Sequence, residues 1–283
     1  MLFQPASQDF KWSYSNVSAT RPAAAFGTSV TPAVLPTKGS WVQVISAANM
    51  ANDGWGIMVN INSSSTSSAT RQQIVDVGVD NAGGTSYLVK IPDLICGHAA
   101  PYNVGSGGVW YYFPIFIKAG STVAVRASGT TTGAIRAYIT VYGLPRRPEN
   151  VRVGHEVYSF GVNATTGQGT AITLGTTAEG AWTQIGAALS EAAPFFWQVG
   201  YTCVDTSMTA AVIHFDVGAG DASFKKLLVE NNLITISSSE QIGNLPTTAG
   251  CVGNTAIGDL IYIRGQSSAT PDTSTTVAVY GCA

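Results

Sequence analysis

The sequence predicts an all-β protein that consists of two tandem antiparallel β-sandwich domains of the jelly-roll kind. Three observations predict this fold class. Apolar and polar residues alternate with a period of two, turn-forming Gly, Ser, Asn and Pro residues interrupt the alternation at short intervals, and the pattern occurs twice in 283 residues. Residues 119–143 and 257–281 show all three features, because each contains two alternating runs around a turn-rich segment and ends in Val-Tyr-Gly.

The repeat is colinear along the chain. Gly120 aligns with Gly258 and Arg126 with Arg264, and no gap is needed up to the Val-Tyr-Gly endings. Three shorter matches precede this one in the same order: residues 27–31 with 169–173, 39–44 with 180–185, and 76–78 with 216–218. The offset shrinks in single residues between matches, as expected if residues were lost from surface loops, where length changes cost little. The order of the matches indicates that one module was duplicated.

The repeat and the proline-containing segment between its two copies define the domain organisation. We expect an N-terminal arm (1–25), a first β-sandwich (26–143), a linker (144–150) and a second β-sandwich (151–283). The linker contains Pro145 and Pro148, which remove backbone donors and favour an extended path. Each repeat is long enough to bury a core of its own.

The arm has no match in the second repeat, and its aromatic residues Phe3, Phe10, Trp12 and Tyr14 follow no sustained period. A segment this short cannot bury these rings by itself. We expect an extended arm that docks either on a neighbouring subunit or back on its own domain.

The expected strands are runs rich in Val, Ile, Thr and aromatic residues between turn-forming residues. For example, the alternating run WGIMVNI ends at a serine-rich segment. The first domain is expected to contain strands at 27–31, 41–45, 55–61, 73–79, 87–91, 109–117, 121–127 and 134–142. The second is expected to contain strands at 151–161, 168–173, 182–185, 195–201, 210–217, 226–229, 233–237, 260–264 and 275–280.

Composition excludes several classes of partner. Fourteen Lys and Arg against sixteen Asp and Glu give a net charge of −2, so the chain has no basic field for nucleic acid. No stretch approaches the roughly 20 apolar residues that span a bilayer, and the N-terminus lacks the features of a secretion signal. We therefore expect that the chain is made in a cytoplasm and that it does not insert into a membrane. The four cysteines occupy different positions in the two repeats, which predicts reduced, buried thiols.

No motif for catalysis, a metal or a cofactor is present. His98, His155 and His214 lie far apart with no zinc-type spacing, and GxSxG does not occur. We expect no enzyme, no metal and no cofactor.

Two pairs of carboxylates flank Val-Gly in equivalent places, Asp76 with Asp80 and Asp216 with Asp221. Each pair could offer oxygens to calcium, but calcium takes six to eight ligands. The favoured interpretation is that these carboxylates cap strand ends or turns.

A Gly-rich segment precedes three consecutive aromatic residues, Trp110, Tyr111 and Tyr112. Together with Trp55, Trp110 and Tyr111 could form a platform on which a sugar ring stacks. The alternative is that Trp110 and Tyr112 are core residues while Tyr111 lies at an interface.

Residues 115–143 resemble a motif of structural proteins from tailed bacteriophages and gene transfer agents, in which Arg-containing alternating strands end a β-domain. Arg126, Arg136 and the Val-Tyr-Gly ending carry the resemblance. The second repeat departs from it, with Asp259 in place of Ser121 and no counterpart of Arg136.

The resemblance implies a non-enzymatic virion component that is assembled in the host bacterial cytoplasm, such as a tail fibre, baseplate or head-spike protein. Its expected partners are its own copies, with a trimer expected for a fibre, other virion proteins, and host surface polysaccharide as a candidate ligand. Two alternatives remain: a carbohydrate- or receptor-binding module for a host glycan, and a double jelly-roll capsid shell or decoration protein.

Overall fold

The structure, a computed structural model, describes residues 11–14, 27–63, 71–98, 109–143, 152–190, 193–203, 210–236, 241–244, 251–269 and 275–283. Within these ranges the chain forms twenty β-strands and one short 3-10 turn, η1 (Ala47–Asn49). The prediction of an all-β fold is confirmed. None of the described residues belongs to a helix long and apolar enough to cross a membrane.

The first half of the chain forms two facing sheets. Sheet 1a has the order β1 (Lys11–Tyr14), β10 (Ile135–Gly143), β5 (Gly54–Ser63), β8 (Val109–Phe113), and β2 (Thr28–Val30) also pairs with β10. Sheet 1b has the order β3 (Ala33–Val34), β9 (Thr122–Gly129), β6 (Arg71–Asp80), β7 (Leu88–His98), and β4 (Val42–Ile45) also pairs with β9.

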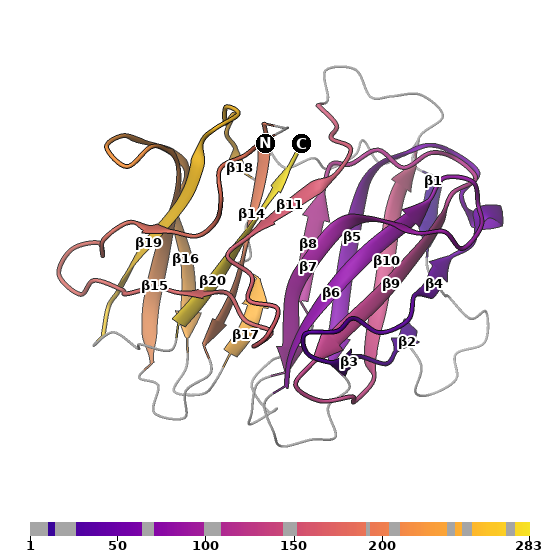
Figure 1. The fold of residues 1–283 in the computed structure, drawn as a ribbon, viewed down its shortest axis with the longest axis horizontal. Helices are drawn as coiled ribbons and strands as arrows, with labels where there is room; N and C mark the ends of the chain where they lie inside the picture. The colour runs from indigo at the N-terminus through magenta and orange to yellow at the C-terminus, as the bar shows by residue number, and fades with distance from the viewer. Residues whose placement is uncertain are drawn as a thin grey trace.

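The second half repeats this arrangement (Figure 1). Sheet 2a has the order β11 (Val157–Phe160), β20 (Thr275–Cys282), β14 (Phe196–Cys203), β17 (Gln241–Asn244), with β12 (Thr170–Ala171) on β20 and β18 (Cys251–Val252) on β14. Sheet 2b has the order β13 (Thr183–Gln184), β19 (Leu260–Ser267), β15 (Ala211–Gly220), β16 (Lys225–Ile236). In both halves the strands are distributed between the two sheets in the same order, which is the jelly-roll topology.

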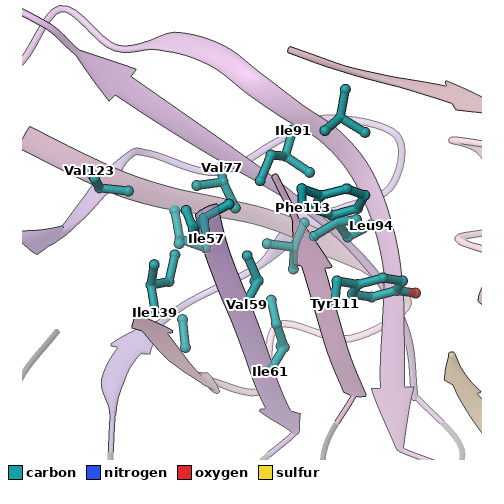
Figure 2. Packing of buried hydrophobic residues seen from close by; sticks show 14 of the residues in the cluster. Ile57, Val59, Ile61, Val77, Ile91, Leu94, Tyr111, Phe113, Val123 and Ile139 are labelled. Atoms are coloured by element: carbon teal, nitrogen blue, oxygen red, sulfur yellow. The ribbon is translucent and has the colours of Figure 1, made fainter. Parts of the chain in front are cut away.

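Each sandwich encloses its own apolar interior. In the first, Ile57, Val59 and Ile61 of β5 point across to Val77 of β6 and Val123 of β9 (Figure 2). These side chains are 3% exposed or less. The period-two alternation of each strand therefore places one apolar face inside, as the sequence predicts.

In the second sandwich the interior is built around Trp197, which is fully buried and donates its indole N–H to the Gly253 carbonyl at 2.9 Å. Val199 and Tyr201 follow it on the same face of β14 and pack with Phe215 of β15. Since a buried indole N–H needs a partner, the bond to Gly253 fixes the orientation of the ring.

The structure corrects two expectations about strands. Strands β7 and β16 are longer than expected, because Asp93 and Asn231 form β-bulges with φ of 52° and 50° and the strands continue past them. The N-terminal arm also has a counterpart in the second repeat, because its strand β1 pairs with β10 in the same way as β11 pairs with β20. Trp12 and Tyr14 lie in β1, whereas Phe3, Phe10 and the linker 144–150 lie outside the described residues.

Candidate interface and binding surfaces

The contact between the two sandwiches shows how this chain buries a sheet face. The outer face of sheet 2a packs against β7 and β8, the edge strands of the first sandwich (Figure 1). Phe196, Tyr280 and Cys282 of sheet 2a belong to the same apolar cluster as Leu94 and Ile95 of β7. As a result, all eight residues of both β14 and β20 are buried, so these strands are covered on both faces.

Two tyrosine hydroxyls are bonded within this contact. The Tyr280 hydroxyl accepts the Ile95 N–H at 2.7 Å and donates to the Asp93 carbonyl at 2.9 Å. The Tyr111 hydroxyl donates to the Ile95 carbonyl at 2.6 Å. Burial raises the pKa of both hydroxyls well above its usual value, so both remain neutral donors. Together they satisfy the N–H and C=O of Ile95 and the C=O of Asp93 at the free edge of β7.

The structure separates the three residues of the predicted saccharide platform. Tyr111 is 1% exposed and points into the first sandwich (Figure 2), so its ring is not available for stacking on a sugar. Trp55 packs against Phe116, with ring centroids 5.1 Å apart. Trp110, which is 46% exposed, pairs with Asn60, five residues along β5 from Trp55 and therefore roughly 17 Å away. The alternative is right for Tyr111, which lies at the contact between the two sandwiches against Tyr280, but wrong for Trp110, which faces outwards instead of into the core.

Instead, Trp110 belongs to a larger surface that the sequence analysis missed, the outer face of sheet 1a. We call this surface the aromatic face; it consists of Met58, Asn60, Trp110, Tyr112, Tyr138 and Tyr142. Apart from Trp110 its members are partly buried. The Tyr142 hydroxyl contacts the Met58 sulfur at 3.6 Å, and the Tyr112 and Tyr142 rings meet edge to face at 5.8 Å. The alternation of β8 and β10 was the available signal, but it does not say which side is the outer one.

The aromatic face is the counterpart of the sheet 2a face that the first sandwich covers. Tyr142 occupies the position of Tyr280 in the repeat, since both precede the Gly of the Val-Tyr-Gly ending. In β20 every residue is buried, whereas in β10 the outward-facing Arg136, Tyr138 and Tyr142 are partly exposed. The same sheet face is therefore fully buried in one domain and partly exposed in the other.

A cluster of charges lies on the outer side of sheet 1b. Asp76 accepts from Arg126 at 2.8 Å and from Lys38 at 2.7 Å, and Lys38 also pairs with Asp93 at 2.8 Å. The Arg126 guanidinium stacks on Trp41, 4.5 Å from the ring centroid. Burial by itself would raise the pKa of Asp76, but Lys38, the Asp93 amide and Arg126 outweigh it and hold this pKa below the usual 3.8.

The second domain repeats this cluster with one sign reversed. Arg264 donates to Asp216 at 2.8 Å and stacks on Trp182 at 4.5 Å. Glu179 stands where the first domain has Lys38, and it also pairs with Arg264. Burial would raise the pKa of Asp216, but the Asn231 amide and Arg264 lower it, while burial and the neighbouring Asp216 raise the pKa of Glu179.

Glu179 and Asp216 also form, with His214, a group whose potential metal-ligating atoms lie within 4.8 Å of one another. The guanidinium of Arg264 already bonds both carboxylates, so the protein supplies its own cation at this position. The first domain, in which Lys38 replaces Glu179, shows that the position serves ion pairing. We therefore assign the group a structural role.

The two remaining aspartates of the calcium alternative cap turns. Asp80 accepts the N–H groups of Ala82 at 2.8 Å and Ser86 at 2.9 Å. Asp221 accepts the N–H groups of Ser223 and Phe224, both at 2.7 Å. The interpretation of these carboxylates as caps is confirmed.

A shallow surface cleft of about 750 Å³ lies beside β12. Its polar lining consists of amide and hydroxyl side chains, Asn163, Thr166, Gln168, Thr170 and Thr276, and none of the described residues that border it has a titratable side chain. The cleft therefore offers hydrogen-bond donors and acceptors to a ligand.

The buried thiols agree with the prediction from cysteine spacing. Cys96, Cys203 and Cys282 are free and buried. Burial raises the pKa of Cys96 and of Cys282 to about 12, which keeps both protonated and unreactive near neutral pH.

Comparison with known proteins adds little to this geometry. No family model matches the chain, and no curated protein matches it significantly. Two crystal forms of PNGF-II have TM-scores of 0.38 and 0.39 at 9% identity; they match 97% of this chain, which spans only 66% and 65% of theirs. The CBM22-1-CBM22-2 tandem domain of Paenibacillus barcinonensis Xyn10C has a TM-score of 0.26 at 10% identity, over 99% of this chain and 93% of its own. These likenesses are too weak to bear on function, and none of these structures is described as a virion protein.

Proposed function

We propose that this chain is a non-enzymatic structural component of a multi-copy assembly, of the virion type that its repeat resembles. The observation that carries the proposal is the different fate of one sheet face in the two domains. In the second domain the face is buried, whereas in the first its outward-facing residues are partly exposed and Trp110 is 46% exposed. A surface of this kind marks a site of association.

The rest of the molecule supports an assembling role. The two sandwiches are joined through a continuous apolar cluster, so the chain offers its neighbours a stiff building unit. Only 11% of its residues are charged, so few charges have to be desolvated when copies pack together. Its expected partners are its own copies and other virion proteins.

Sedimentation velocity of the purified chain over a wide range of concentration tests the proposal. We expect a stable oligomer, and a trimer if the assembly is a fibre. A chain that stays monomeric at the highest concentration would refute self-assembly. Antibody labelling of intact particles tests the virion location, and closed shells in electron micrographs would favour the double jelly-roll shell alternative over a fibre, baseplate or spike.

A second candidate function, binding of a host glycan, is favoured by the exposure of Trp110 next to Asn60. An exposed indole beside an amide suits a sugar ring, because the ring can stack while the amide bonds its hydroxyls. A glycan array comparing the wild type with Trp110→Ala tests this function, with Phe224→Ala in the second domain as a matched exposed-aromatic control. Loss of binding by Trp110→Ala alone, with the oligomer intact, would support recognition, whereas binding unchanged by it would exclude the platform.

A further inference from the structure

The second sandwich has an open sheet edge at β16. This strand lies at the end of sheet 2b, and β15 is its one partner among the described strands. A strand at a sheet edge presents unpaired N–H and C=O groups, which form a template for pairing with another strand. The edge of β16 therefore offers backbone hydrogen bonds that sheet 2b does not use.

The counterpart of β16 in the first sandwich, β7, shows which of these backbone groups face outwards. Asp93 of β7 and Asn231 of β16 occupy the same bulge, so Ile95, two residues further, corresponds to Leu233. The N–H and C=O of Ile95 both lie at the free edge of β7, because they bond two tyrosine hydroxyls of the contact between the domains. By the same register, the N–H and C=O of Leu233 lie at the free edge of β16.

Leu233 lacks the cover that Ile95 has. Its side chain is 58% exposed, whereas that of Ile95 is 0% exposed. None of the described residues bonds the edge-facing N–H and C=O of Leu233. Val212, which lies diagonal to Leu233 on β15, is 45% exposed and extends the apolar patch. The same edge position is thus closed in the first domain and open in the second.

The backbone around Leu233 fits a second copy of itself. When two identical strands pair antiparallel about a two-fold axis, one residue of each copy lies on the axis opposite its equivalent. With Leu233 on the axis, its N–H and C=O bond the C=O and N–H of the other Leu233, which is the hydrogen-bonded pair of an antiparallel sheet, with Cα atoms about 5.5 Å apart. The two exposed leucine side chains then lie side by side on one face of the joined sheet.

The side chains on this part of the edge also suit a second copy. Residues 231–236, NNLITI, carry no charge, so two copies of the segment do not repel each other. With Leu233 on the axis, Thr235 of each copy lies opposite Asn231 of the other, which places polar side chains on both sides of the leucines. The charged residues of β16 all precede Asn231, where the bulge ends the regular pairing.

We propose that two copies of this chain pair through β16 about a two-fold axis at Leu233, so that their two 2b sheets join into one continuous sheet. Both copies use the same surface, so the contact is isologous and closes as a dimer. It therefore predicts an oligomer with an even number of copies, in contrast to the trimer expected for a fibre. The inference rests on the proposed self-assembly.

The test places charges on the two-fold axis. Leu233→Lys and Leu233→Glu each put two like charges opposite each other, so sedimentation velocity should show that each weakens dimerisation at least about tenfold. A mixture of the two variants should form a one-to-one heterodimer, because opposite charges then face each other. Ile257→Lys is the matched control, since Ile257 is 63% exposed and lies outside sheet 2b, and it should dimerise like the wild type.

Each other outcome overturns a defined part. A wild-type trimer, or a wild-type oligomer that neither variant weakens, refutes the pairing through β16 and leaves self-assembly standing, whereas a monomeric wild type refutes both. Two variants that dissociate and stay monomeric when mixed show that Leu233 contacts a different surface, which also refutes the two-fold pairing. Circular dichroism checks folding. If either charged variant unfolds, Leu233→Ser replaces it, and association as strong as in the wild type then counts against the proposal.

Discussion

Tyr280→Phe tests the hydrogen bonds that join the two sandwiches. The change removes one oxygen and keeps the ring, which meets Tyr111 edge to face at 5.3 Å. The Ile95 N–H then has lost its 2.7 Å acceptor, and the Asp93 carbonyl has lost its 2.9 Å donor. Since Tyr280 and Ile95 are both 0% exposed, water does not replace the lost hydroxyl without opening the contact.

The expected loss follows from the cost of a buried polar group without a partner. Leaving one such group unsatisfied costs about 1–3 kcal/mol. The Asp93 carbonyl belongs to a residue that is partly exposed and adds little, so we expect the free energy of unfolding to fall by about 2–3 kcal/mol. The melting temperature should fall by several degrees.

Urea denaturation of the wild type and the variant measures this loss. Tyr158→Phe is the matched control, because its hydroxyl donates to Glu156 at 2.6 Å at an exposed site where water can take its place. The control should lose less than about 1 kcal/mol. Equal losses in the two variants, or no loss in Tyr280→Phe, would show that these bonds do not hold the domains together.

Three further predictions concern the charge clusters and the thiols. In urea denaturation, Arg264→Ala should lower the free energy of unfolding by about 3 kcal/mol, and Arg126→Ala by about 1–2 kcal/mol. The losses differ because Asp216 is left facing the carboxylate of Glu179, whereas Asp76 keeps its ion pair with Lys38. Equal losses would contradict this reasoning. The free energy of unfolding should decrease as pH falls from about 5 to 3, because Asp76 and Asp216 have pKa values below 3.8 in the folded chain, so the unfolded chain binds protons first. Urea denaturation at several pH values measures this dependence, and Asp76→Asn should flatten it. A thiol reagent near pH 8 should leave the three buried cysteines unmodified until denaturant is added, so more than one rapidly reacting thiol in the native chain would argue against their burial.

The fold could be predicted because its signal is local and occurs twice. Alternation with a period of two identifies strands, and colinear repetition identifies two copies of one module. The bulges could not be predicted in the same way. Pro92-Asp93 and Asn231-Asn232 have the composition of turns, and only the pairing of Asp93 and Asn231 with the buried aspartates keeps β7 and β16 continuous.

The surfaces could be predicted only in part. The match of Asp76 with Asp216 and of Arg126 with Arg264 was visible in the sequence, but their ion pairs depend on strand register, which pairs β6 with β9 and β15 with β19. Tyr111 was included in the predicted saccharide platform because consecutive aromatic residues of a strand point to opposite faces of its sheet, and the sequence does not show which face is buried. Here Tyr111 is inside, and its hydroxyl bonds β7, the strand that precedes β8 in the chain but belongs to the other sheet of the sandwich.

Sheet 2a is shared by both domains, since its inner face completes the core of the second jelly roll and its outer face packs against the first. Because this contact is apolar, a movement of one domain away from the other would expose buried side chains of both to water. Loss or replacement of either half would in the same way expose the apolar contact surface of the half that remains.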